Sequence, residues 1–288
     1  MLYQTDEWRK EKKKITQIKI DKFDQTNSMF VLTHAHIDHL NKLKHAQRVY
    51  CSSMTYTLLS TYYPNLIELP EIYNQMILVD QCNIILLKNG HSPGALSIYN
   101  DGMLYLGECR IDAIILDKIK HIHTQYGIHT VYYDGIFEDV RNQPTPQESI
   151  EILQEFLIQH PDTIIRIRHF GTVSLLIQLQ DYFCFRPICE KVKPTGRVTG
   201  QCLMYNTLDK HVFDCADENK PIIYVACDNV KCHNTIVLSA LYFITKPHLP
   251  KNTVILVDGI YRLYWSDHAA FNEIQTLKRL LPATFIKI

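Results

Sequence analysis

The segment THAHIDHL constrains this chain more than any other part of its sequence. It places His34, His36, Asp38 and His39 within six residues, directly after the apolar run 30–32. Because alternate side chains of a strand point the same way, His34 and His36 can meet one ion at the ~2.0 to 2.1 Å that zinc prefers. Asp38 and His39 can face a neighbouring ion. The motif predicts a metal centre at the end of a buried strand; the alternative is a surface loop with coincidental histidines.

Two further ligand candidates lie downstream, each at the end of a predicted strand. His91, in NGHSPGA, follows the strand pattern of residues 83–88. A single histidine is usually a loop or core residue, but its position directly after a strand favours metal binding here. Glu108 ends a hairpin expected over residues 95–108, whose Asn-Asp-Gly turn tolerates positive φ. A carboxylate that can bridge two ions would complete the ligand set.

The strand and helix patterns divide the chain into three parts. Short β-branched runs dominate residues 1–140, whereas residues 141–250 alternate strand and helix patterns broken by prolines and glycines. Residues 251–288 return to strand patterning and end in an amphipathic helix. With 288 residues the chain suits one large domain or two modest ones. We therefore expect an α/β fold in which a smaller α/β module, residues 141–250, is inserted into a larger domain.

One helix start is marked clearly. Thr145, Pro146 and Glu148 supply an N-cap, a proline at the first helical position and a capping-box acid. We expect a helix from here that stops before Pro161.

Charge, hydropathy and cysteines limit the class of protein. Lys plus Arg and Asp plus Glu both total 30, so an anionic partner must be held by local patches. The first twenty residues lack an apolar secretory core and no run is long enough to cross a bilayer, so we expect a soluble protein that is not secreted. The nine cysteines are odd in number and scattered, which predicts a reducing compartment and mostly unpaired, buried thiols.

The motifs together resemble the metallo-β-lactamase superfamily, which combines HxHxDH with a later histidine and a later acid, each after a strand. The blocks IKIDKFDQ, NGHSPGALSIY, LYLGECR, TVYYDGIFED and YWSDHAAFNEI are similar to the DNA-repair branch of the β-CASP nucleases. The resemblance runs from about Ile15 to the C-terminus, although residues 161–250 match by order alone. It implies an αββα metallo-β-lactamase sandwich with metals at its edge and a β-CASP-like insert.

The resemblance also implies a ligand set. Zinc is the implied first ion, and a second site would hold Zn²⁺, Mg²⁺ or Mn²⁺. The family usually has aspartate where this chain has Glu108, so this position is either adapted to the longer carboxylate or a decayed site. Asp21 would support the ligands from behind. The implied ligands are His34, His36, His91 and Glu108 for one ion, and Asp38, His39 and Glu108 for the other.

A proton relay is implied by two further blocks. In the family, the acid after TVYY and the histidine after the C-terminal strand act at the leaving group, here Asp134 and His268. From the residues alone, Asp134 could be a turn residue, with Asp267 a helix N-cap and His268 in the first helical turn. RNA-cutting relatives carry a further histidine near the end, whereas this chain finishes PATFIKI, which favours DNA.

The expected activity is that of a metal-dependent DNA nuclease. A zinc-activated water would hydrolyse phosphodiester bonds in DNA repair or end processing, as a 5′-exonuclease or a structure-specific endonuclease. Asp38, Asp134 and His268 are the expected catalytic residues. The partner would be single-stranded DNA or DNA with single-stranded ends, bound by a monomer in the nucleus or another DNA-containing compartment. Candidate phosphate contacts are Lys42, Lys44, Arg48, Arg166 and Arg168.

Two other functions and one more metal site stay open. A small-molecule hydrolase of the same superfamily would share the first metal motif. A non-catalytic DNA- or partner-binding relative is suggested by Glu108. A structural zinc site in the insert would compete with the interpretation of its residues as core cysteines. Its candidate ligands are Cys202, Cys227, Cys232 and His233, with Cys215 as a further option.

Overall fold

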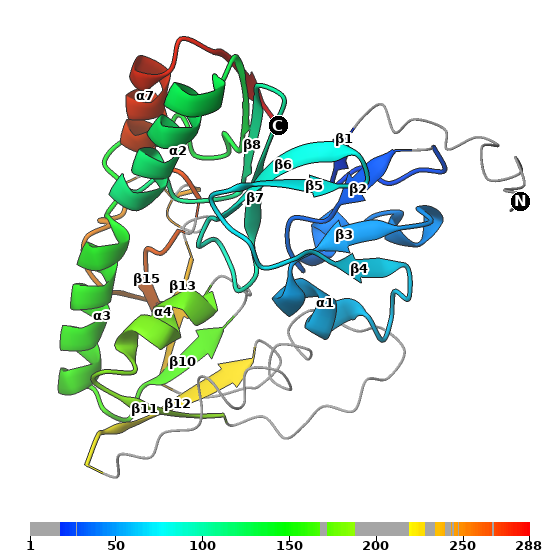
Figure 1. The fold of residues 1–288 in the computed structure, drawn as a ribbon. Coiled ribbons are helices and arrows are strands. Elements are labelled where there is room, and N and C mark those ends of the chain that lie inside the picture. The colour runs from blue at the N-terminus through cyan, green and yellow to red at the C-terminus, as the bar shows by residue number, and fades with distance from the viewer. Residues whose placement is uncertain are drawn as a thin grey trace, which may run out of the picture.

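The strands of the chain form three sheets (Figure 1). The structure, a computed structural model, describes residues 18–26, 28–167, 172–187, 219–227, 234–239, 243, 245–246, 248–266 and 268–288.

Sheet A has four parallel strands in the order β1-β2-β3-β4. All three residues of β2 are buried, as expected for a parallel strand covered on both faces. Two short 3-10 helices, η2 (Ile37–Leu40) and η3 (Leu43–His45), follow β2, and helix α1 (Ser53–Leu59) follows β3. The strands are β1 (Ile18–Ile20), β2 (Met29–Val31), β3 (Val49–Cys51) and β4 (Leu66–Glu68).

Sheet B has six strands in the order β16-β9-β8-β7-β6-β5. Pairing is antiparallel from β5 to β8 and parallel from β8 to β16. The β7–β8 hairpin turns at Asp101 and Gly102, with φ of 44° and 76°, so the expected hairpin is confirmed. The strands are β5 (Met76–Val79), β6 (Cys82–Lys88), β7 (Leu96–Asn100), β8 (Met103–Gly107), β9 (Thr130–Tyr133) and β16 (Thr284–Lys287).

Sheet C has the order β11-β12-β10-β13-β15-β14, and β14 is its antiparallel strand. Strands β14 and β15, which follow residue 250, join this sheet, whereas α7 (Phe271–Leu280) and β16 return to sheet B. The strands are β10 (Ile164–Ile167), β11 (Cys184–Pro187), β12 (Ile222–Cys227), β13 (Thr235–Leu238), β14 (Ile255–Val257) and β15 (Ile260–Leu263).

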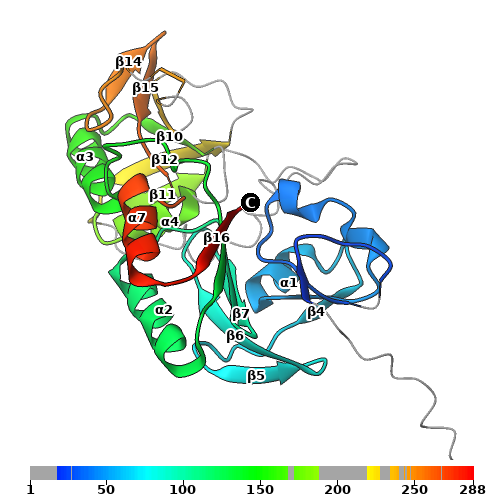
Figure 2. The ribbon, with the colours of Figure 1, turned by 90° about the horizontal axis from the view of Figure 1, so that it is seen from above.

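Apolar clusters show how these sheets pack. Met29 and Val31 of β2 share one cluster with Ile84 and Leu86 of β6, so sheets A and B contact each other face to face. Helix α2 (Ala113–Tyr126) and α7 cover the other face of sheet B (Figures 1 and 2). The other face of sheet A shares a cluster with α1 and sheet C. The expected α/β class is therefore confirmed.

Helix α3 (Pro146–Gln159) begins where its capping residues predict. Thr145 Oγ1 accepts a hydrogen bond from the Glu148 amide at 3.2 Å, and Glu148 Oε2 accepts one from the Thr145 amide at 2.7 Å. This helix and α4 (Thr172–Leu179) pack against each other beside sheet C.

The structure also bears on membrane-spanning helices and on the pairing of the cysteines. Among the described residues, no helix combines the length and the apolar character needed to cross a bilayer. Cys51, Cys82 and Cys109 are free thiols, but Cys184 is disulfide-bonded. The expectation of unpaired cysteines is therefore wrong for Cys184, because cysteine number and spacing do not report which thiols meet in the fold.

Candidate metal centre

The HxHxDH segment leaves sheet A at the end of β2 and turns towards sheet B. The Leu96 amide donates a hydrogen bond to the Thr33 carbonyl at 3.1 Å, which joins this segment to the start of β7. His34 is buried, with 2% exposed, and Asp38 and His39 lie on η2. The strand end and the 3-10 helix together therefore present the histidines on the side where β6 and β8 also end.

All six predicted ligands come together there. In each of two groups, one ligand atom from every residue lies within 4.8 Å of the others. The groups are His34, His36, His91 and Glu108, and Asp38, His39 and Glu108. Asp38 is the most open member, since its side chain is 71% exposed. We call these six residues the ligand cluster.

Glu108 lies at the middle of the ligand cluster. Its Oε2 is 2.9 Å from His91 Nε2 and 3.6 Å from His34 Nε2, and its Oε1 is 3.1 Å from His39 Nε2. One carboxylate oxygen thus faces each of the two groups. The glutamate side chain is longer than the aspartate that the resemblance implies at this position, and its carboxylate still reaches the histidines.

Supporting residues hold the ligands from behind. Asp21, at the end of β1, accepts hydrogen bonds from the Thr33 amide at 2.9 Å and from Thr33 Oγ1 at 2.7 Å. Its Oδ2 is also 2.8 Å from His39 Nδ1, which leaves Nε2 of that ring turned towards Glu108. Thr33 Oγ1 lies 2.9 Å from His34 Nδ1. Asp21 therefore has the contacts of the supporting residue that the resemblance implies.

Asn89 is a supporting residue that the sequence analysis missed. Its Oδ1 accepts a hydrogen bond from the His91 amide at 3.2 Å, and its amide nitrogen donates to Leu106 O at 3.3 Å. The side chain is 4% exposed. An asparagine two residues before His91 was the available signal, because asparagine side chains often hydrogen-bond the backbone two residues further on.

Burial and hydrogen bonding set the charges of the cluster. Burial lowers the pKa of His34 and His91, and the contact with Glu108 only partly offsets it. For His39, burial also lowers the pKa, but hydrogen bonds to Asp21 and Glu108 outweigh it and raise the pKa to about 10. Burial would raise the pKa of Glu108, whereas contacts with the four histidines hold it well below its usual range. Ligands bind an ion as carboxylates and neutral imidazoles, so Glu108, His34 and His91 are already in ligand form, whereas His39 would have to release a proton to bind an ion.

The donor set fits a divalent transition-metal ion. Three imidazoles and a carboxylate are ligands that zinc and iron both accept. Within the described part of the chain, the buried Nε2 of His34 has no hydrogen-bond partner, although it faces Glu108. A buried ring nitrogen of this kind is costly unless something occupies its lone pair. These residues are therefore a candidate metal site, with the identity of the metal left open by the donor set.

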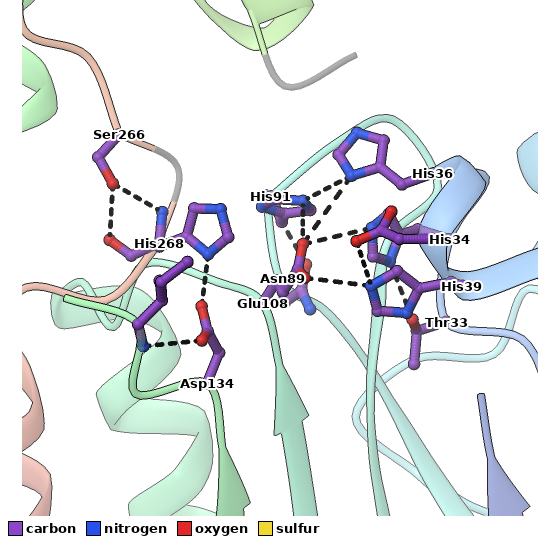
Figure 3. Close-up of polar contacts among 12 residues, drawn as sticks. Thr33, His34, His36, His39, Asn89, His91, Glu108, Asp134, Ser266 and His268 are labelled. Atoms are coloured by element: carbon purple, nitrogen blue, oxygen red, sulfur yellow. Dashed lines mark hydrogen bonds and ion pairs between the residues drawn. The ribbon is translucent and has the colours of Figure 1, made fainter. Parts of the chain in front are cut away.

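Asp134 and His268 meet beside the cluster (Figure 3). Asp134 Oδ2 and His268 Nδ1 share a short hydrogen bond, and the His268 ring centroid is 5.0 Å from that of His91. We call these two residues the relay pair. Helix α7 has Ala270 as its N-cap, so the alternative that Asp267 caps this helix with His268 in its first turn is wrong. The chain runs extended at Ala270, which delays the helix start by three residues.

The predicted phosphate contacts are spread more widely. Lys42 and Lys44 are exposed just after η2, near the ligand cluster in sequence. Arg48 precedes β3 and is hydrogen-bonded to Asp80, and the β2–β3 register sets it beside Met29, at the opposite end of β2 from His34. Arg166 lies in β10, within sheet C. Arg168 lies outside the described residues.

Most candidate ligands of the predicted structural zinc site in the insert lie outside the described residues, so this prediction is not tested. Cys227 is the last residue of β12. Cys202, Cys215, Cys232 and His233 lie outside the described residues.

Comparisons with known proteins return weak similarities. No protein-family model and no curated protein sequence matches the chain. A flavo di-iron protein mutant from Thermotoga maritima is 12% identical, covers 74% of this chain with 62% of its own length, and gives a TM-score of 0.23. A flavoprotein crystal structure from the same organism is 12% identical over 91% of this chain and 74% of its own, with a TM-score of 0.23. This chain thus spans less than two thirds of the first of these proteins, and such TM-scores do not establish a shared fold.

Proposed function

We propose that this protein is a metal-dependent nuclease that hydrolyses phosphodiester bonds in DNA. The observation that carries the proposal is the position of the relay pair, whose His268 ring lies 5.0 Å from the ring of His91 in the ligand cluster. A metal site beside a histidine held by a carboxylate would provide the two functions that phosphodiester hydrolysis needs, an activated water and a proton for the leaving oxygen.

Separate residues of the chain would hold the metal ion and transfer the proton. When bound, a divalent ion supplies a more acidic water and positive charge next to the scissile phosphate. The ligand cluster fixes the place of that ion, and Asp21 orients His39. Asp134 holds the Nδ1 side of His268, so that Nε2 is left to give a proton to the leaving oxygen. Asp38, exposed at the rim, would complete a second site.

DNA is proposed as the substrate because of the sequence blocks that resemble the DNA-repair β-CASP nucleases. Artemis is the member that these blocks resemble most, and the proposal includes its αββα sandwich and β-CASP module. Sheets A and B in contact, with α2 and α7 outside one of them, are compatible with that architecture. We further propose single-stranded or single-strand-ended DNA as the partner, zinc in the first site, a monomer, and a role in repair or end processing in the nucleus.

The test combines elemental analysis with a nuclease assay. Purified protein would be assayed for bound metal and for cleavage of 5′-phosphorylated single strands, DNA hairpins, RNA and a thioester panel. We expect bound zinc and cleavage of DNA, with both lost in His36→Ala. His121→Ala, an exposed histidine on α2, is the matched control and should behave as wild type. Thioester turnover without DNA cleavage would favour the small-molecule hydrolase instead.

Glu108 favours a second candidate, a non-catalytic DNA- or partner-binding relative. Its Oε2 lies within 4 Å of His34, His36 and His91, in the space between the imidazoles. A carboxylate that bonds directly to these rings would compete with an ion. If the protein binds DNA without cutting it, and Glu108→Asp gains both metal and cleavage, the site is decayed. A loss of activity in Glu108→Asp would instead show adaptation to the longer side chain.

A further inference from the structure

A partly buried ion pair joins the loop after β8 to the start of α7. Arg110, two residues after Glu108, donates hydrogen bonds from Nε and Nη2 to Glu273 Oε1 at 2.9 and 2.6 Å. The two side chains are only 12% and 19% exposed. Charge-assisted bonds from a planar guanidinium fix direction as well as distance. We call this ion pair the Arg110–Glu273 clamp.

The second oxygen of Glu273 binds the backbone on both sides of the clamp. Glu273 Oε2 accepts hydrogen bonds from the Ile111 amide at 3.0 Å and from the Ala270 amide at 3.1 Å. Ile111 belongs to the loop that carries Glu108, and Ala270 lies two residues after His268. One carboxylate therefore ties the loop that carries Glu108 to the loop that carries His268, which we call the relay loop, although Ile111 and Glu273 are 162 positions apart in the chain.

Arg110 also reaches the residues before His268. Its Nη1 donates to the Ser266 carbonyl at 3.4 Å, and Ser266 Oγ accepts a hydrogen bond from the His268 amide at 3.2 Å. The guanidinium thus touches the backbone before His268 directly, and the backbone after it through Glu273. Asp134 fixes one ring nitrogen of His268, but a single hydrogen bond does not fix the main chain that carries the ring.

We propose that Arg110 is the positioning residue that sets His268 at its working distance from the ligand cluster. This inference rests on the proposed nuclease function. Arg110 does not touch the ligand cluster or the relay pair through any described contact; it acts through Ser266 and Glu273. Three segments of the site, around Glu108, Asp134 and His268, would then be held in one geometry by two side chains, Asp134 and Arg110.

The conservative replacement is informative because lysine cannot copy the arginine fork. Arg110 uses three nitrogens for two acceptors, Glu273 and Ser266, whereas a lysine has one nitrogen on a flexible stem. Arg110→Lys keeps a cation beside Glu273, so it should fold, but it should lose the contact with Ser266. Lys278→Met is a matched control, since Lys278 makes another ion pair of α7, with Glu138 at 2.5 Å, and has no described contact with residues 266–268.

The experiment compares wild type, Arg110→Lys and Lys278→Met as full-length chains. The first readout is the imidazole ¹⁵N–¹H spectrum of metal-free protein, with the His268 signals assigned by their absence in His268→Gln. We expect the hydrogen-bonded Nδ1–H signal of His268 to shift or broaden in Arg110→Lys and to stay unchanged in Lys278→Met. The second readout is cleavage, in which kcat of Arg110→Lys should fall about 100-fold while KM and metal content are unchanged.

The possible results distinguish a failure of the positioning role of Arg110 from a failure of the proposed nuclease function. If Arg110→Lys keeps the wild-type kcat, or keeps the wild-type His268 signal, the positioning role is wrong even though the nuclease proposal stands. If the wild type does not cut DNA at all, the nuclease proposal fails, and the His268 signal alone then decides whether Arg110 positions that ring. A fall in metal content in Arg110→Lys would also overturn the inference, because the residue would then act on the ligands.

Discussion

The ligand cluster and the relay pair lie side by side, but the chain builds them in different ways. Four of the six ligands follow β2 within six residues, and the other two follow β6 and β8 of the adjacent hairpin sheet. The two residues of the relay pair are 134 positions apart in the chain. Asp134 comes before the first strand of sheet C, and His268 comes after its last strand. The first group depends on local strand geometry, and the second depends on how the chain returns after sheet C.

Because the two regions are built differently, substitutions in them should have different effects on metal binding and turnover. The HxHxDH part of the ligand cluster is supported by residues close to it in sequence, since Asp21 directly follows β1 and Thr33 lies just after β2. The relay pair needs long-range contacts, such as those that attach α7 to the loop after β8. Damage to the first should remove metal, whereas damage to the second should leave metal in place and remove turnover.

The largest effect is expected from His91→Ala. This ring is 2% exposed and its Nε2 is 2.9 Å from Glu108, so its loss removes a buried ligand from the first group. Bound metal and DNA cleavage should both fall to background, further than the ~100-fold that a lost supporting partner costs. Elemental analysis and the cleavage assay measure both, with His121→Ala as the control. Normal metal content in His91→Ala would remove this residue from the ligand set.

His268→Ala should separate the two regions. Cleavage should fall by about 10²- to 10⁴-fold, because a positioned proton donor is lost at the leaving group. Metal content should stay at the wild-type level, since His268 is not among the ligand cluster. Asp134→Asn should change activity in the same direction, because Asp134 acts through His268. Metal lost in proportion to activity would mean that the two regions form a single site.

The ligand cluster could be predicted from sequence because each ligand follows a strand. Alternation places His34 and His36 on one side of their strand, and β6 and β8 run the same way because each is antiparallel to β7, so His91 and Glu108 lie at one edge of sheet B. That the HxHxDH motif, which follows a strand of sheet A, joins them was implied by the resemblance. Asp134 follows β9 in the same sheet, and its meeting with His268 was implied by the resemblance alone. That the cluster binds metal stays a prediction.

The remaining features depend on long-range pairing that local patterns do not report. The strand pattern of β14 and β15 was recognisable, but not that these strands join sheet C. Arg48 is close to the metal motif in sequence, yet the parallel β2–β3 register sets it at the other end of β2. Arg110 and Glu273 are 163 positions apart, and a single charged residue carries no sign of its partner.

A smaller effect is expected from Asp21→Asn. The amide keeps the shape, but an NH₂ group at the position of Oδ2 would face two donors, Thr33 Oγ1 and His39 Nδ1. Metal affinity should fall about 10- to 100-fold, as for other supporting partners of metal ligands. Competition with a chelator measures the affinity, and Asp24→Asn, an exposed neighbour, is the control. Unchanged affinity would show that η2 holds His39 without Asp21.

The smallest effect should come from Glu138, which links β9 to α7. Its carboxylate accepts hydrogen bonds from Lys278 Nζ at 2.5 Å and from Tyr133 Oη at 3.0 Å. The bond from Lys278 is the main reason that the pKa of Glu138 is lowered. The stability it contributes is therefore fully present above the unfolded value near 4.5 and is lost as the pH falls through the lower folded value.

Glu138→Gln should accordingly lower the free energy of unfolding at pH 7 by about 1 kcal/mol, because the pair is only partly buried. The difference from wild type should shrink as the pH falls below the unfolded value near 4.5 and should be lost below the lower folded value, where the wild-type carboxyl is also neutral. Urea unfolding at a series of pH values measures it, with Glu155→Gln, an exposed glutamate of α3, as the control. A difference that stays constant with pH would mean that Glu138 stabilises through packing rather than charge.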